Sequence, residues 1–219
     1  MKTLQISIIV VIIVTIGMTS VTYLTLESNI DKQNQEEKLE ARVHALTDNG
    51  TKYVKISDFT PNSSAIFVYP YTGNKTLDES AHNRWILIRL PTHDGGDKDD
   101  ISSFRAYSVI DIQLNCIIKY WANREWLEDP CHGSLYEPVY GIPFAGPAIN
   151  YQFKNNALPQ LDLGVDSDRY IYVKPPIFDI NKNGLVGYGR KVPSDIFEKY
   201  IEIGNTHLKT VLRNEQPGL

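Results

Sequence analysis

The chain has 219 residues, with 22 Lys and Arg against 26 Asp and Glu, and a formal net charge of -4. This length allows one sizeable core, and the acidic balance gives no reason to expect nucleic-acid binding. The sequence also has no Gly-rich phosphate loop and no CxxC redox motif, and it has only two cysteines.

The first segment is strongly apolar. Residues 4–24 hold only scattered polar side chains, and about 20 apolar residues suffice to cross a bilayer as a helix. We predict a transmembrane anchor in residues 1–25, with a cleaved signal peptide as the alternative. Lys2 precedes this segment while Glu27 and Asp31 follow it. The positive-inside bias therefore predicts a single-pass protein of the cell membrane, with a cytoplasmic N-terminus and an extracytoplasmic head.

The remainder of the chain changes character twice. Residues 26–50 are rich in Gln, Glu and Lys, which predicts a polar neck or linker helix. Short β-branched and aromatic runs between turn residues then predict an antiparallel sandwich over residues 51–192. The cap and the apolar spacing in residues 193–219 predict an amphipathic helix. We expect this helix to pack on the sheet, and the alternative is that it docks on a membrane partner. The runs expected to form strands are 53–56, 65–69, 84–90, 104–108, 116–121 and 170–173.

Two acidic segments are weaker signals. Residues 93–100 contain His, Gly and four Asp, and residues 179–184 match the opening of an EF-hand loop. The EF-hand match fails at its twelfth position, where Arg190 replaces the expected Glu. We expect the first segment to be a solvated loop and the second an ordinary polar turn.

The most specific motif is Asp129-Pro-Cys-His-Gly-Ser134, with Asp111-Ile-Gln-Leu-Asn-Cys116 upstream. The pair resembles the two loops of the Rieske iron–sulfur family, in which the first is C-x-H-x-G-C and the second is C-P-C-H-G-S. In the second loop only the leading Cys differs. The resemblance extends over about residues 84–173. It implies an all-β, Rieske-like antiparallel β-sandwich with an inserted two-loop, cluster-type subdomain at about residues 109–149.

The resemblance also assigns roles to positions in both loops. A Rieske [2Fe–2S] centre takes two thiolates on one iron and two imidazoles on the other. Asp111 and Asp129 stand at the thiolate positions, Gln113 stands at one imidazole position, and His132 matches the other imidazole. Three of four ligands are changed, so we expect no cofactor. The alternatives are a single divalent metal (Fe, Mn or Zn) on these four residues, which is the kind of donor set such ions accept, or a non-standard [2Fe–2S] centre.

The other matched positions surround the ligand positions. The resemblance implies a disulfide between Cys116 and Cys131, and a single cysteine pair on the oxidising side of a membrane agrees with this. By the same resemblance, Ser134 and Tyr136 match hydroxyl donors to the cluster sulfurs. Gly146 and Pro147 match the proline loop that covers the cluster.

These assignments lead to an expected function. Membrane-anchored Rieske heads carry electrons between a quinol oxidation site and a cytochrome or copper acceptor in cytochrome bc-type complexes. A head that lacks three ligands is expected to be an accessory or structural component of a respiratory electron-transfer complex, with integral-membrane cytochrome-type or other subunits as partners. The alternative is an electron-transfer protein with a mononuclear metal or a non-standard cluster. If redox-active, the chain would be a subunit of a quinol-oxidising type of complex.

Overall fold

The structure is a computed structural model that describes residues 29–30, 32–33, 42–47, 50–113, 115–150, 155–174 and 189–215. The chain divides into two compact units, Met1–Glu40 and Ala41–Leu219. The four described residues of the first unit are helical. The predicted anchor in residues 1–25 and the polar turn at 179–184 lie outside the described residues. Among the residues that are described, no helix is both long enough and apolar enough to cross a bilayer.

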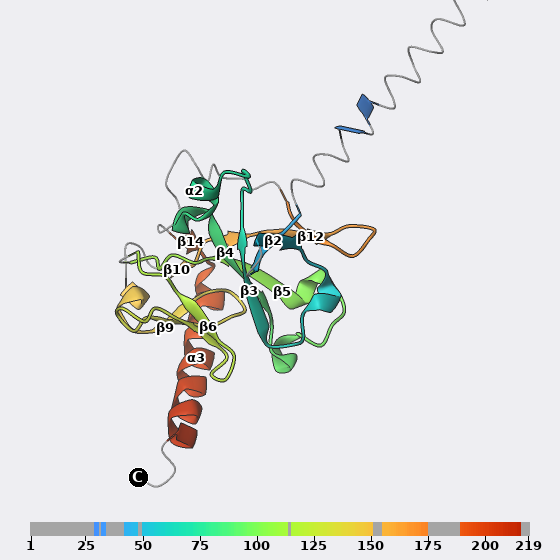
Figure 1. Ribbon diagram of the computed structural model, residues 1–219. Helices are drawn as coiled ribbons and strands as arrows, with labels where there is room; N and C mark the ends of the chain where they lie inside the picture. Colours follow the sequence, from blue (N-terminus) through green and yellow to red (C-terminus); the bar gives the residue numbers. More distant parts are fainter. Residues whose placement is uncertain are drawn as a thin grey trace, which may run out of the picture. The chain divides into compact units, whose positions relative to one another are not determined.

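A six-stranded antiparallel sheet forms the centre of the second unit (Figure 1), in the order β11-β5-β4-β3-β1-β2. Its central strand β4 is almost continuously apolar, and Trp85, Leu87 and Ile88 are fully buried. Such a run is typical of a strand that is covered on both faces. The strands are β1 His44–Thr47, β2 Gly50–Tyr53, β3 Ser63–Val68, β4 Arg84–Arg89, β5 Phe104–Ser108 and β11 Gln160–Leu161.

Shorter elements complete the main core. Ile171 and Val173 of a two-stranded ribbon are buried in the same apolar cluster as Leu87 of the large sheet. This ribbon pairs β12 Leu163–Val165 with β13 Ile171–Val173, and a second ribbon pairs β10 Asn156–Ala157 with β14 Arg190–Lys191. The short helices are α2 Lys75–Asp78, η1 Ile56–Asp58, η2 Ala81–Asn83, η3 Thr92–Asp94, η4 Ile101–Ser103 and η5 Pro147–Asn150.

A second, four-stranded sheet is inserted after β5, in the order β6-β7-β8-β9. Its strands are β6 Lys119–Trp121, β7 Trp126–Glu128, β8 Leu135–Tyr136 and β9 Pro143–Ala145. All these strands fall within the range 109–149 in which the inserted subdomain is expected. We call this sheet with its connecting loops the tip sheet.

The C-terminal helix α3, Ser194–Glu215, runs alongside the tip sheet and contacts β9 (Figure 1). Gly204, in the middle of α3, lies directly against the Phe144 ring, where a Cβ atom would overlap that ring. A glycine at this position allows the close approach, although glycine within a helix lowers the stability of the helix relative to alanine. All paired strands of the described residues are antiparallel. The predicted antiparallel β fold with a C-terminal helix is therefore confirmed.

Two expected boundaries are wrong. The polar neck was predicted to extend to residue 50, yet β1 pairs with β2 and β3 inside that range, and Val43 and Ala45 are buried. Because polar residues surround Val43 and Ala45 in the sequence, the local pattern does not indicate that these two positions are buried. The strand expected at 53–56 also ends early, because the Lys55 N–H donates to the Asp58 carboxylate and the chain turns into η1.

Candidate functional site

Two loops at the end of the tip sheet carry the residues that the sequence singles out. The first loop lies between β5 and β6 and is closed as a hairpin, because the Asp111 N–H donates to the Cys116 carbonyl over 2.8 Å. The second loop lies between β7 and β8. It turns back through Gly133, whose φ is +76°, and the Asp129 N–H donates to the Ser134 carbonyl over 2.9 Å.

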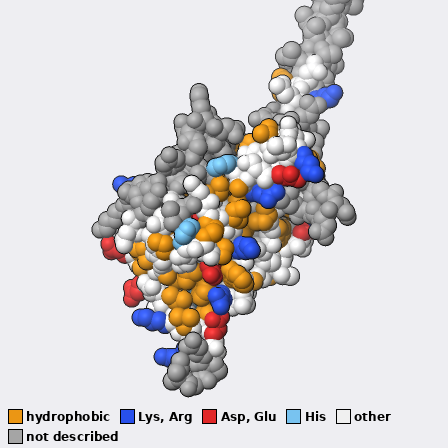
Figure 2. Space-filling model, turned by 60° about the vertical axis from the view of Figure 1, so that its left-hand side comes forward, with side chains coloured by type: hydrophobic (Ala, Val, Ile, Leu, Met, Phe, Trp, Pro, Cys, Tyr) orange, Lys and Arg blue, Asp and Glu red, His pale blue; other side chains and the backbone are white. Residues whose placement is uncertain are grey.

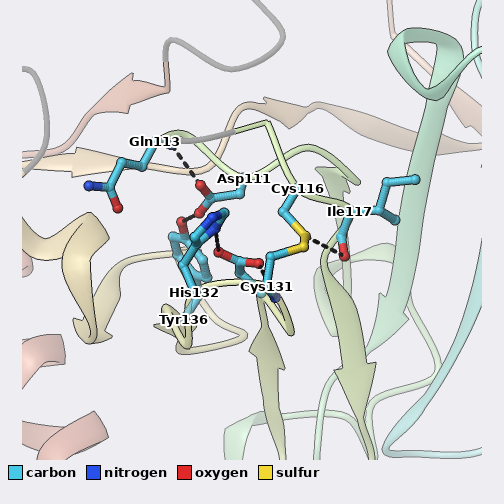
Figure 3. Close-up of a disulfide and its surroundings, with 8 residues drawn as sticks. Asp111, Gln113, Cys116, Ile117, Cys131, His132 and Tyr136 are labelled. Carbon is cyan, nitrogen blue, oxygen red and sulfur yellow. Dashed lines mark hydrogen bonds and ion pairs between the residues drawn. A yellow bond between two sulfur atoms is a disulfide. The ribbon is translucent and has the colours of Figure 1, made fainter.

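A disulfide joins the two loops (Figure 3). Cys116 and Cys131 are bonded, with their Cα atoms 6.3 Å apart and a sequence separation of 15. The predicted disulfide is therefore confirmed. Both sulfurs are consumed in this bond, so neither is available as a thiolate ligand.

Asp111, at the first thiolate position, is completely buried. Its carboxylate accepts a hydrogen bond from the Gln113 N–H over 2.8 Å and another from the Tyr136 hydroxyl (Figure 3). Burial raises the pKa of Tyr136, and the Asp111 charge raises it further. Tyr136 therefore keeps its proton and acts as a hydrogen-bond donor to Asp111.

Asp129, at the second thiolate position, is also completely buried. One carboxylate oxygen accepts from the Cys131 N–H over 2.8 Å, and the other lies 2.9 Å from Nδ1 of His132. The first bond closes a turn of the type that Asp favours. The second orients the imidazole, whose side chain is about one third exposed. Each buried acid is thus engaged by groups of the protein itself.

The residues around these acids play different parts. The Gln113 side-chain oxygen is buried and has no hydrogen-bond partner among the described residues. Ser134 is buried, and its hydroxyl accepts from the Ala148 N–H over 3.3 Å. Gly146 lies against the Gly133 carbonyl, where a Cβ atom would overlap it, and its φ is +79°. The 146–148 segment, with Pro147 at the start of η5, therefore packs directly on the second loop.

The residues at the tip do not fit a Rieske cluster. The two cysteines are oxidised to a disulfide, and hard carboxylate oxygens replace the soft thiolates that sulfide-bridged iron prefers. His132 is the one imidazole among the described residues of the two loops. Moreover, the carboxylates at the thiolate positions are hydrogen-bonded to Tyr136 and to the Cys131 backbone.

A single metal at Asp111, Gln113, Asp129 and His132 stays a prediction. Among the described His, Cys, Asp and Glu residues, three ligand atoms come within 4.8 Å of one another only in the group of Cys116, Asp129 and Cys131. Two members of this group are the disulfide sulfurs. Asp129 and His132 are in contact, but Asp111 does not complete a compact set with them.

No family model and no curated protein matches the chain. Among solved structures it is similar to the crystal structure of the cyanobacterial plasma membrane Rieske protein PetC3 from Synechocystis PCC 6803. That match has 17% sequence identity and a TM-score of 0.32, and it covers 42% of this chain and 77% of the other.

Proposed function

We propose that the chain is a Rieske-like protein of a membrane electron-transfer assembly, whose tip carries no iron–sulfur cluster and serves as a docking surface for another subunit. The support comes from the motifs of the two loops and from their position at the end of a separate small sheet. Such a protein contributes to the assembly by binding, because its tip lacks the thiolates and the second imidazole that cluster chemistry needs.

One observation carries the proposal. Both acids at the thiolate positions are fully buried, and each is satisfied by hydrogen bonds within the tip. A buried carboxylate without such partners would be costly, and it would favour a bound cation instead. Here Tyr136 donates to Asp111, although the family resemblance assigns this hydroxyl to a cluster sulfur. The tip is therefore organised around its own side chains.

The exposed surface of the tip supports docking. Ile117, next to the disulfide, is 48% exposed, and Cys131 and His132 are exposed beside it. An apolar side chain on a loop that is held by a disulfide loses little conformational freedom on binding. The proposed partner is an integral-membrane subunit, since the apolar segment at residues 4–24 would hold the head at a membrane surface.

A second candidate is a protein that holds one divalent metal at the tip. The observation in its favour is the buried side-chain oxygen of Gln113, which lacks a hydrogen-bond partner among the described residues. With Asp111, Asp129 and His132 it would make up a set of oxygen and nitrogen donors of the kind that Fe(II), Mn or Zn accept. Electron transfer would then depend on that metal.

The proposal is tested by measuring iron and acid-labile sulfide in the full-length chain, purified under oxidising conditions and again after reconstitution with iron and sulfide. We expect no stoichiometric cluster in the unchanged protein. A matched control restores the family ligands through Asp111→Cys, Gln113→His and Asp129→Cys, and this variant should gain a visible [2Fe–2S] spectrum. Two iron and two sulfide in the unchanged protein would overturn the proposal, whereas one metal without sulfide that is lost in His132→Ala would support the second candidate.

A further inference from the structure

The disulfide at the tip is accessible from solvent. Cys131 is exposed on the second loop, and Cys116 is partly exposed on the first. His132 and Gly133, which follow Cys131 in the chain, are exposed as well. Thiolates attack disulfides directly, and exposed disulfides are the ones that undergo exchange. The bond between the two cysteines is therefore within reach of a dithiol reductant while the protein is folded.

Hydrogen bonds hold both loops in place independently of the disulfide. In the first loop, the Ile118 N–H donates to the Val109 carbonyl over 2.8 Å. In the second loop, the Gly133 N–H donates to the Asp129 carbonyl over 2.9 Å. The buried hydroxyl of Tyr136 connects β8 to the first loop. The two cysteines, whose Cα atoms are 6.3 Å apart, therefore stay side by side after the bond between their sulfurs is broken.

A buried carboxylate lies beside the two sulfurs. The ligand atoms of Cys116, Asp129 and Cys131 are all within 4.8 Å of one another. Sulfur and oxygen ligands on a tetrahedral Zn²⁺ are about 3.5–3.8 Å apart, since Zn–S is roughly 2.3 Å and Zn–O roughly 2.0 Å. Small rotations of the thiol side chains after reduction therefore suffice to place the three atoms around one ion.

The carboxylate in this group has a fixed orientation. One oxygen of Asp129 accepts from the Cys131 N–H over 2.8 Å, and the other lies 2.9 Å from Nδ1 of His132. Each carboxylate oxygen has two lone pairs, so both hydrogen bonds leave capacity for a metal. Hydrogen bonds of this kind orient the carboxylate ligands of metal sites. Asp129 is thus positioned for a metal before one binds.

Reduction changes the chemistry of the two sulfurs. A dithiol donor passes two electrons and two protons to the Cys116–Cys131 bond, which breaks into two thiols, while the donor is oxidised to its own disulfide. A divalent metal then displaces both thiol protons and leaves two thiolate ligands. Thiolates select Zn²⁺ over Mg²⁺ and Ca²⁺, which prefer oxygen ligands.

We propose that the reduced tip binds one Zn²⁺ ion through Cys116, Cys131 and Asp129, and that the disulfide blocks this site in the oxidised protein. Three protein ligands leave the fourth position of a tetrahedral ion for water. The exposure of Cys131 opens that position to solvent. The ion joins the same two loops as the disulfide and so replaces the lost crosslink. The site does not depend on whether the tip docks on another subunit.

The test compares the two redox states of the unchanged full-length chain. The protein is reduced with a phosphine and titrated without oxygen with Co²⁺, a spectroscopic substitute for Zn²⁺. We expect one equivalent of Co²⁺ to bind with a sulfur-to-metal absorption band in the near ultraviolet, and Zn²⁺ to displace it. Zn²⁺ at 100 times Kd should raise the Tm of the reduced protein by about 5–10 °C. The oxidised protein should show neither effect.

Two substitutions test the ligands. Asp129→Asn keeps the size of the side chain and should weaken Co²⁺ binding to the reduced protein at least about tenfold, because it removes a charged ligand. The matched control is Glu128→Gln at the preceding position, since the Glu128 carboxylate contacts Trp126 and Arg124 instead. Binding should be unchanged in this control. Cys116→Ser combined with Cys131→Ser should abolish the near-ultraviolet band.

The absence of this band from the reduced, unchanged protein would overturn the proposal. Equal Co²⁺ binding by the oxidised protein would overturn it too, since the metal would then lie on oxygen and nitrogen donors, as in the second candidate function. Both outcomes come from the unchanged chain, so they hold even if Asp129→Asn disturbs folding. The iron and sulfide content of the oxidised protein is the separate test of the proposed function.

Discussion

The Tyr136 hydroxyl donates a hydrogen bond to the buried carboxylate of Asp111, and so connects β8 to the first loop across the tip. The family resemblance assigns this hydroxyl to a cluster sulfur and Asp111 to a thiolate ligand. In this chain the two residues satisfy each other instead. Asp111 thus gives the Tyr136 hydroxyl a hydrogen-bond acceptor within the protein.

Tyr136→Phe should destabilise the protein by about 1.5–3 kcal/mol, because it removes the hydrogen bond from the Tyr136 hydroxyl to the buried Asp111 carboxylate. Urea unfolding, with the transition followed by Trp fluorescence, measures the change. The control is Tyr172→Phe, at a half-buried position on β13, where we expect a change below about 0.5 kcal/mol. Equal effects of the two substitutions would contradict the assigned role of Tyr136.

Cys116→Ser combined with Cys131→Ser should lower the free energy of unfolding by about 3 kcal/mol, because a loop of 15 residues is no longer closed in the unfolded chain. Reductant should lower the Tm of the unchanged protein and leave the Tm of the double variant where it was. If reductant shifts both proteins equally, its effect does not come from this disulfide.

The sequence predicted the tip better than it predicted the rest of the fold. The resemblance to the Rieske loops, together with a total of only two cysteines, was enough to predict the Cys116–Cys131 disulfide, and the two residues are bonded. Short runs of β-branched and aromatic residues likewise located β4 and β5. The strand β1 was missed, because Val43 and Ala45 are buried by long-range pairing that local polarity does not show.

A cleft beside α3, lined by His93, Glu125 and His207 among other residues, was not predictable in the same way. Residues 93–100 were expected to be a solvated loop, and nothing in the sequence connects His93 with Glu125 or His207. His93 and Glu125 lie 3.7 Å apart between η3 and the β6–β7 turn, and α3, which packs on the tip sheet through Gly204 and Phe144, brings His207 to the same cleft. A glycine within an otherwise helical segment was the one local signal of a close approach at this position.

Glu137 should make stability depend on pH. Burial raises its pKa from 4.5 to about 7, although it accepts hydrogen bonds from the N–H groups of Ile142, Val139 and Tyr140. The folded protein therefore holds this proton more tightly than the unfolded chain. The resulting stability is complete below about pH 4.5, falls as pH rises towards 7, and is on the order of 3 kcal/mol in total.

The measurement for Glu137 is the free energy of unfolding at pH 5 and pH 8, for the unchanged protein and for Glu137→Gln. Other groups titrate in both proteins. The difference between the pH dependences of their free energies of unfolding therefore isolates the contribution of the Glu137 carboxyl. The unchanged protein should lose more stability between the two pH values than the variant does. Parallel pH profiles would show that Glu137 ionises in the folded state as readily as in the unfolded one.

Ile117→Asp should weaken docking of the tip, because it places a charge on the apolar side chain next to the disulfide. The matched control is Leu212→Asp on α3, since Leu212 is 49% exposed and Ile117 is 48% exposed. Figure 2 shows apolar side chains gathered on one face of the molecule, so a control outside the tip is needed. Size analysis of the chain in gently solubilised native membranes reports whether it migrates in a larger assembly. We expect Ile117→Asp to shift the chain to its free size and Leu212→Asp to leave the assembly intact, because only the first substitution alters the tip. An assembly that is lost in Leu212→Asp and kept in Ile117→Asp would assign docking to α3. If neither variant nor the unchanged chain migrates in a larger assembly, the proposed function is contradicted.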